Sequence, residues 1–446
     1  MILKQYYLGC LAHASYLIAD ESTGTAAVVD PQRDIEQYVL EAKRLGVEIK
    51  HVLLTHFHAD FVAGDRELQQ TCGATIYVGA AAAPEYDCEK LEDGDVLEFG
   101  NVRIQALATP GHTPESMCYL VFDLAQDGAN PQAVLTGDTL FIGDVGRPDL
   151  LGSVGIKPED LASSLYDSLH DKLLRLPDAT LVYPAHGAGS MCGKNLSTET
   201  VSTIGQQKLV NYALQPMPRA DFIAMITQGQ PQAPAYFLHD ALMNRRPRTT
   251  LDEVIEGSLV PMTLEQALAA QEQGAQLVDV RDDNEVVGGT LQGAFHISLS
   301  GSFATWAGSL LALDQPVIVI AAPGREREAV TRMARIGLDR VVGFVDGFEL
   351  ELQRHPGLRQ QTPQIDLDTL RDKLASDAPP LVLDVRTPTE WQNGHIDGAL
   401  HVPLIELQDR VDEVPRDREL AVLCRTSNRS ASAISILRRA GHDNVV

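Results

Sequence analysis

A repeat in the second half of the sequence is the feature that most restricts how this chain can fold. Six residue identities recur with a single spacing of 105 positions. The first set is Asp279, Arg281, Glu285, Gly293, Ala294 and His296, and the second is Asp384, Arg386, Glu390, Gly398, Ala399 and His401. Chance does not readily give six matches in one register, so we infer two copies of one domain. A chain of 446 residues leaves room for a larger domain before them.

The second copy places a cysteine between an apolar run and a helical pattern. Residues 420–423 predict a buried strand, residues 424–430 (Cys-Arg-Thr-Ser-Asn-Arg-Ser) predict a polar loop, and a helical pattern follows. A cysteine in that position meets several backbone N–H groups and the positive end of the helix, which favours a thiolate or a persulfide. Arg425 and Arg429 add positive charge for an anionic sulfur donor. A buried, inert cysteine is a poor alternative in so polar a loop.

The length of this loop distinguishes two kinds of cysteine enzyme. Cysteine phosphatases place an arginine six positions after the cysteine, whereas Arg429 lies five positions after Cys424. Together with residues 381–399, this shorter loop resembles the rhodanese family of sulfurtransferases. The resemblance implies that Cys424 is the catalytic nucleophile, with Arg425 and Arg429 beside it. Ser427 replaces the glycine that is usual in that loop, so the sequence leaves the detailed backbone geometry of the loop open.

The first copy has no comparable nucleophile. Its corresponding segment, residues 317–327, carries alanine where the cysteine would stand, and the chain has no cysteine between residues 193 and 423. We therefore expect an inactive copy with a structural or docking role. The second copy stops before a segment corresponding to residues 343–348, so its last helix is expected to be absent from this chain.

The first half of the chain follows an α/β pattern. Strands are predicted near residues 13–30, 75–78, 102–108, 118–122, 133–136 and 180–183. Residues 35–45 have helical spacing, and Gly46 is placed as the residue that ends this helix. Short strands separated by helices predict an αββα sandwich that carries a functional site on loops at one edge.

Four polar stations follow apolar runs in this half, and the most prominent is Thr-His-Phe-His-Ala-Asp-Phe at residues 55–61. It follows a predicted strand and precedes a helical pattern that begins near Asp60. The other stations are Gly111-His112, Thr136-Gly137-Asp138 and Ala185-His186-Gly187. Imidazoles and carboxylates at such turns can converge on a metal ion. One histidine alone would more simply be part of a solvated polar loop.

These stations resemble the metallo-β-lactamase superfamily, with one departure. Phe61 stands where the two-zinc hydrolases of that superfamily carry a histidine, and a benzyl group donates no lone pair. The branch that tolerates this change is the persulfide dioxygenases, which are similar to glyoxalase II in fold and hold one ferrous ion. The segment at residues 141–150 is also similar to that branch.

The resemblance implies roles for named residues. His56, His112 and Asp138 would bind one Fe(II) per chain, leaving one face open for O₂ and substrate. His58, Asp60 and His186 would orient ligands and waters. Arg147 and Asp149 would shape the substrate pocket. The implied reaction oxidises a low-molecular-weight thiol persulfide with O₂ to sulfite, and Cys424 exchanges sulfur among persulfide, sulfite and thiosulfate. A homo-oligomer, either a dimer or a tetramer, is expected.

Composition restricts partners and compartment. The 36 basic and 61 acidic residues give a net charge of −25, which argues against nucleic acid and anionic membrane surfaces as partners. No apolar run approaches the ~20 residues that span a bilayer, and residues 1–7 lack a signal-peptide pattern. Six cysteines without framework spacing suit a reducing compartment, so we expect a cytoplasmic protein and packing roles for five of the six.

We expect three domains and consider two competing functions. The domains are a persulfide dioxygenase-like domain at 1–245, an inactive rhodanese-like domain at 258–356 and an active one at 362–446. Residues 244–250 are basic and contain proline, which favours a solvated linker over an arm lying on the first domain. One alternative is a thioester hydrolase similar to glyoxalase II, for which Phe61 is unfavourable. The other is a non-catalytic sulfur carrier or regulatory protein, which the combined presence of His56, His112, Asp138 and Cys424 disfavours.

Overall fold

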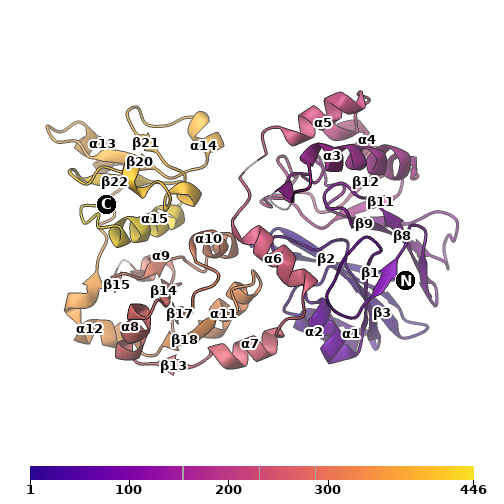
Figure 1. The fold of residues 1–446 in the computed structure, drawn as a ribbon, viewed down its shortest axis with the longest axis horizontal. Coiled ribbons are helices and arrows are strands. Elements are labelled where there is room, and N and C mark those ends of the chain that lie inside the picture. Colours follow the sequence, from indigo (N-terminus) through magenta and orange to yellow (C-terminus); the bar gives the residue numbers. More distant parts are fainter. Residues whose placement is uncertain (153–154, 231, 287) are drawn as a thin grey trace. The chain divides into compact units, whose positions relative to one another are not determined.

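The computed structural model describes residues 1–152, 155–230, 232–286 and 288–446 (Figure 1). The chain divides into two compact units. The first unit comprises Met1–Leu251 with Arg335–Gly337, and the second comprises Asp252–Ala334 with Leu338–Val446. No helix in the described part of the chain is both long enough and apolar enough to cross a bilayer.

The first unit contains two six-stranded sheets. One has the order β1 (Ile2–Leu8), β2 (His13–Asp20), β3 (Thr25–Val29), β4 (Glu48–Leu53), β5 (Thr75–Gly79), β6 (Glu89–Leu91). The other has the order β12 (Ser202–Thr203), β11 (Leu181–Pro184), β10 (Ala133–Gly137), β9 (Met117–Asp123), β8 (Val102–Ala108), β7 (Val96–Phe99). The helices are α1 (Glu36–Leu45), α2 (Asp65–Cys72), α3 (Pro158–Asp167), α4 (Ile204–Val210), α5 (Arg219–Thr227), α6 (Tyr236–Arg245) and the start of α7 (Leu251–Ser258).

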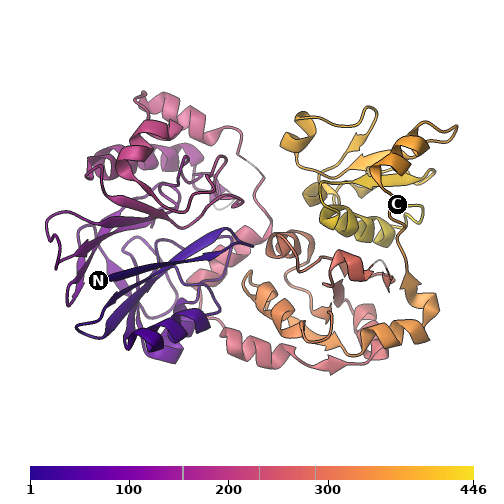
Figure 2. The same ribbon diagram turned by 180° about the vertical axis from the view of Figure 1, so that it is seen from behind.

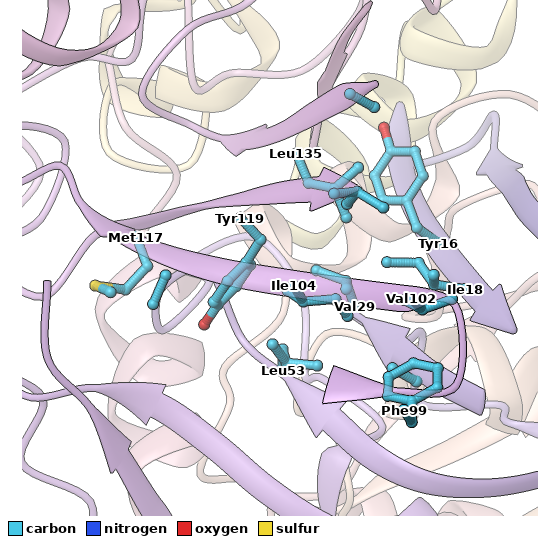
Figure 3. Packing of buried hydrophobic residues seen from close by; sticks show 14 of the residues in the cluster. Tyr16, Ile18, Val29, Leu53, Phe99, Val102, Ile104, Met117, Tyr119 and Leu135 are labelled. Atoms are coloured by element: carbon cyan, nitrogen blue, oxygen red, sulfur yellow. The ribbon is translucent and has the colours of Figure 1, made fainter. Parts of the chain in front are cut away.

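The two sheets of the first unit face each other across an apolar core. Side chains of Tyr16 and Val29 from one sheet pack against Ile104, Tyr119 and Leu135 from the other (Figure 3). Helices α1 and α2 cover the outer face of the first sheet through a second apolar cluster. Helices α3, α4 and α5 cover the outer face of the second sheet through a third. Each sheet thus buries both faces, which stabilises the layers and confirms the predicted αββα sandwich (Figures 1 and 2).

Local sequence patterns predicted the positions of most of these helices and strands correctly. Helix α1 ends at Leu45, and Gly46 adopts a left-handed φ of 69° that a glycine accepts without strain. The helix expected from Asp60 begins instead at Asp65. The residues between Asp60 and Asp65 are held in a loop by partners far along the chain. The local spacing of apolar residues therefore could not show that the helix starts later. Gly64 is required there, because a Cβ atom would lie 2.1 Å from the carbonyl oxygen of Gln32.

Residues 244–250 lie on the first unit, so the preferred interpretation as a solvated linker is wrong. Asn244 is 1% exposed, and the side chain of Arg248 is 3% exposed. Arg248 donates to the carbonyl of Ala63 and to Asp65 Oδ1, at 2.6 Å from the latter. Arg33 donates to the carbonyl of Thr249 at 2.8 Å. A buried guanidinium needs such carboxylate partners, and the first unit supplies them.

The second unit contains two copies of an α/β domain, each with a parallel sheet. In the first copy the sheet order is β13 (Pro261–Met262), β18 (Val341–Val345), β17 (Val317–Ile320), β14 (Gln276–Asp279), β16 (Phe295–His296), with helices α8 (Leu264–Glu272), α9 (Asp283–Val286), α10 (Phe303–Leu310), α11 (Glu326–Ala334) and α12 (Phe348–Arg354). In the second copy the order is β21 (Leu400–His401), β20 (Leu381–Asp384), β22 (Leu420–Leu423), with helices α13 (Leu367–Leu374), α14 (Pro388–Gln392) and α15 (Asn428–Arg439). A short ladder joins β15 (Thr290–Leu291) and β19 (Arg359–Gln360).

Strand register aligns the two copies. Asp279 pairs with Ile320 in the first copy, and Asp384 pairs with Leu423 in the second. The residue after each of these partners therefore occupies the same place, so Ala321 corresponds to Cys424. The predicted repeat of a parallel α/β domain is confirmed.

Candidate functional site

Four loops of the first unit bring the predicted polar residues together. His56 follows β4, His112 lies between β8 and β9, Asp138 follows β10, and His186 follows β11. The backbone of the loop that carries Asp138 passes close to the side chain of Thr55. Gly137 has a φ of 51°, and a Cβ atom there would lie 2.7 Å from the Thr55 side chain. The Thr-Gly-Asp sequence thus allows Asp138 to reach the histidines.

His56, His112 and Asp138 form a buried group that could hold a metal ion. Their donor atoms all lie within 4.8 Å of one another. Asp138 Oδ2 lies 3.8 Å from His56 Nε2 and 3.5 Å from His112 Nε2. This oxygen is buried and has no hydrogen-bond partner among the described residues. Because a buried carboxylate oxygen without a partner is costly, the arrangement fits a cation at this point.

The remaining ring nitrogens of both histidines are engaged by the chain. His112 Nδ1 lies 2.8 Å from the carbonyl oxygen of Arg147, which can only accept, so Nδ1 carries the proton. Thr55 Oγ1 donates to Asp30 at 2.8 Å and lies 3.0 Å from His56 Nδ1, so it accepts from that nitrogen. In both rings the lone pair is therefore on Nε2, facing Asp138.

Burial and mutual charge set the protonation of this group. Burial lowers the pKa of His56 and of His112, which keeps both imidazoles neutral. Burial alone would raise the pKa of Asp138, but His186 and His56 outweigh it and hold that pKa well below its usual range. Neutral imidazoles beside an ionised carboxylate are the forms that coordinate a divalent metal.

His58, Asp60 and His186 form a second group next to the first. Their donor atoms also lie within 4.8 Å of one another. His186 Nδ1 lies 2.7 Å from Asp138 Oδ1, and its Nε2 lies 2.8 Å from Asp60 Oδ2. Burial lowers the pKa of His186, but Asp138 and Asp60 outweigh it and raise that pKa well above its ordinary value. The ring of Phe61 lies 4.4 Å from that of His58, so an apolar group adjoins this second group.

Three residues of the site were missed from the sequence. His13 at the start of β2 is buried without a hydrogen-bond partner among the described residues, and its ring lies 3.9 Å from that of Phe61. Cys192 is buried in a group with Asp138 and His186, and burial raises the pKa of its thiol well above the ordinary value. It had been counted among the packing cysteines. The glycine-rich sequence around it was the available signal.

Asn244 is the third, and no local signal pointed to it. Its side-chain nitrogen donates to the carbonyls of His58 and Phe61, at 2.8 Å each. Its side-chain oxygen accepts from the backbone N–H of Ala63 at 2.9 Å. One amide on α6 thus ties three points of the histidine loop, from a position more than 180 residues away.

Arg147 and Asp149 pair with each other at the edge of this site. Two parallel hydrogen bonds of 2.8 and 2.7 Å join the guanidinium to the carboxylate. Burial alone would raise the pKa of Asp149, but Arg147 lowers it. The Arg147 carbonyl also accepts from His112 Nδ1, so this ion pair lies beside a residue of the candidate metal site.

The second unit carries Cys424 in the predicted loop between β22 and α15. Its Sγ atom lies 3.4 Å from both the backbone nitrogen and the hydroxyl of Ser430. Ser427 adopts a φ of 67°, which explains why glycine is usual at this position. Arg425 is exposed.

Arg429 is engaged by Glu390. Hydrogen bonds of 2.6 and 2.9 Å join the guanidinium to both carboxylate oxygens. The bond from Arg429 lowers the pKa of Glu390 to about 2. The charge of Arg429 is therefore shared with Glu390 and is not directed at the sulfur alone.

Comparisons with known proteins assign a family to each part of the chain. The metallo-beta-lactamase superfamily model matches residues 8–186, and the rhodanese-like domain model matches residues 263–350 and 366–446. The cytoplasmic hydroxyacylglutathione hydrolase of Arabidopsis thaliana is 37% identical over 187 residues, which are 41% of this chain and 67% of that relative. The mitochondrial persulfide dioxygenase ETHE1 of Bos taurus is 29% identical over 215 residues, which are 47% of this chain and 75% of that relative.

A solved structure extends the likeness beyond the first unit. A metallo-beta-lactamase from Staphylococcus aureus matches with a TM-score of 0.69 at 30% identity, covering 77% of this chain and 98% of that one. The fold and the buried group of histidines and an aspartate that could hold a metal together define an enzyme of the metallo-beta-lactamase fold. The chain belongs to the metallo-beta-lactamase superfamily and carries two rhodanese-like domains after that domain, as the sequence predicted.

Proposed function

We propose that this protein oxidises the terminal sulfur of a low-molecular-weight thiol persulfide with O₂ and transfers sulfur at Cys424. The observation that carries the proposal is the buried set of His56, His112 and Asp138, with Phe61 beside the neighbouring polar group. Two imidazoles and one carboxylate on one side of an ion are the donor set of non-heme iron oxygenases. The similarity to a persulfide dioxygenase supports the same reaction.

The metal would be one Fe(II) per chain, held by Nε2 of His56, Nε2 of His112 and Oδ2 of Asp138. Bound iron would supply the binding and activation of O₂. The chain contributes the neutral imidazoles and ionised carboxylate described above, and His186 holds the second oxygen of Asp138 at 2.7 Å. The Phe61 ring lies 3.9 Å from the ring of His13 and 4.4 Å from that of His58, and it adds no lone pair for a metal beside these imidazoles.

Oxidation and transfer balance as two separate reactions. In the first, the persulfide, O₂ and one water give the free thiol and sulfite: the sulfur–sulfur bond breaks, the terminal sulfur is oxidised, and O₂ is reduced. In the second, the Cys424 thiolate attacks the sulfane sulfur of a persulfide, and the thiol leaves with the electron pair. Sulfite then attacks the Cys424 persulfide, which forms thiosulfate and regenerates the thiolate. The backbone N–H of Ser430 lies beside the sulfur that carries the negative charge.

We assign these steps to the three expected domains. Residues 1–245 would carry the oxidation, residues 362–446 the transfer, and residues 258–356 no chemistry of their own. The absence of a nucleophile at Ala321 supports the last assignment.

A thioester hydrolase is the second candidate. It is favoured by the 37% identity to a hydroxyacylglutathione hydrolase and by the group of His58, Asp60 and His186, whose spacing also suits a metal. In such a site two metals would polarise the carbonyl and supply hydroxide.

Metal content and substrate together separate the candidates. Protein purified without O₂ should contain one iron per chain, consume O₂ with glutathione persulfide, and leave S-lactoylglutathione intact. Two zinc ions per chain, with thioester cleavage that survives an iron chelator, would replace the dioxygenase with the hydrolase.

A further inference from the structure

Helix α15 of the second copy contacts the first copy at both of its ends. At the N-terminal end, Ser427 Oγ donates to Asp283 Oδ2 at 2.6 Å, and Asn428 Nδ2 donates to Ser300 Oγ at 2.9 Å. At the C-terminal end, the guanidinium of Arg439 lies 4.0 Å from the ring centre of Phe295. The active loop is thus attached to residues of the copy that lacks a nucleophile.

Asp283 is itself held in place within the first copy. Its Oδ1 atom lies 3.3 Å from Nε2 of His296, whose Nδ1 lies 3.1 Å from the carbonyl oxygen of Asp279. His296 is buried, and the Asp283 side chain is 15% exposed. Burial alone would raise the pKa of Asp283, but the bonds from His296 and Ser427 outweigh it and lower that pKa. The acceptor of the Ser427 hydroxyl is therefore an anchored carboxylate.

Ser427 connects this anchor to the sulfur. Its φ of 67° is one that non-glycine residues rarely adopt, so the conformation needs a contact that maintains it. The carbonyl of Ser427 accepts from the hydroxyl of Ser430 at 2.7 Å and from the N–H of Ala431 at 2.9 Å. Ser430 in turn contacts Cys424 Sγ through its backbone N–H. A shift of Ser427 would therefore move the groups that surround the sulfur.

We propose that the first rhodanese-like copy positions the active loop of the second, with Asp283 holding Ser427 in its left-handed conformation and thereby Ser430 on Cys424. This inference rests on the proposed sulfur transfer at Cys424. It gives the copy without a nucleophile a defined part in the reaction, and Asp283 is a positioning residue because it does not touch the sulfur.

The test compares full-length variants in transfer of sulfur from thiosulfate to cyanide. Asp283→Ala should lower kcat about tenfold, the size expected for one lost hydrogen bond to a charged group, with little change in the KM for thiosulfate. The matched control is Asp282→Asn, because the side chain of Asp282 accepts from Arg325 and Ser298, which both belong to the first copy. That control should stay within about twofold of the parent protein.

A second readout follows the sulfur directly. The alkylation profile of Cys424, which is the time course of its reaction with iodoacetamide measured on the peptide that contains it, should be slower in Asp283→Ala. This readout does not depend on turnover. If the parent protein showed no transfer at all, the proposed function would fail, while the alkylation profile would still decide whether Asp283 positions the loop.

A second change at Ser427 shows whether Asp283 positions the active loop or only holds the two copies together. Glycine accepts a positive φ without help, so adding Ser427→Gly to Asp283→Ala should recover most of the lost rate. Asp283→Asn keeps an acceptor oxygen and should fall between parent and alanine, which guards against a misfolded alanine variant. An unchanged rate and alkylation profile in Asp283→Ala would overturn the proposal, as would equal losses with and without Ser427→Gly.

Discussion

Phe61 is the residue that most separates the two possible chemistries of the first unit. It is buried and lies against His58 and His13, next to the group that could bind a second metal. Its identity was readable from the sequence. The ring of His13 beside it was not, because β2 reaches this point only through the fold of the sheet.

Phe61→His should therefore add a metal. A further imidazole beside His58, Asp60 and His186 supplies the lone pair that the benzyl group lacks. We expect metal content to rise from one toward two ions per chain, and O₂ uptake with persulfide to fall. Elemental analysis gives the stoichiometry. The same change at Phe57, in the same loop, serves as the control and should leave one ion per chain; one ion in both variants would mean that Phe61 does not limit the second site.

At the scale of elements, local patterns predicted what local forces determine. Strands such as β8 were predicted at their observed bounds, because apolar and polar residues alternate at its start as a half-buried strand requires. Helix α2 was placed too early and residues 244–250 were read as solvated for one shared reason. The loop before α2 is held by Asn244 and Arg248, and hydrogen bonds over such separations leave no periodic trace in the sequence.

Asn244→Ala should loosen the histidine loop. The change leaves two buried carbonyls and one N–H without partners, which we expect to lower the free energy of unfolding by about 2–4 kcal/mol. It should also speed loss of the bound metal to a chelator under conditions where the fold persists. Denaturant unfolding and the rate of metal release measure the two effects. Asn130→Ala, in an exposed turn, should change neither; parent-like metal release in Asn244→Ala would show that α6 does not position the loop.

The loop of the first copy should not become active when a cysteine is restored. Pro323 lacks a backbone N–H, and Glu326 accepts from the N–H of Gly324 at 3.2 Å, so fewer donors remain for a sulfur anion. We expect that Ala321→Cys, made in a Cys424→Ser protein, gives no thiocyanate from thiosulfate and cyanide. Recovery above about 10% of the parent rate would mean that the loop needs only its nucleophile.

At the scale of the whole molecule, the proposed function links two sites through sulfite, which one site would form and the other would consume. The first unit would produce sulfite from a persulfide, and the second would combine sulfite with sulfane sulfur at Cys424. The division into a metal-binding fold and a repeated α/β domain was evident from the sequence, because each part carries its own spacing of polar residues. The role of the first copy was not, since it depends on contacts such as that between Asp283 and Ser427.

The measurement that tests this central claim most directly is the ratio of sulfite to thiosulfate formed from glutathione persulfide and O₂. In Cys424→Ser the hydroxyl is too weak a nucleophile to take sulfane sulfur, while His56, His112 and Asp138 are unchanged. O₂ uptake should persist and the product should shift from thiosulfate toward sulfite. His56→Ala should stop O₂ uptake and leave exchange between thiosulfate and thiol intact. An unchanged ratio in Cys424→Ser would contradict the account, because Cys424 would then not act on the product of the metal site.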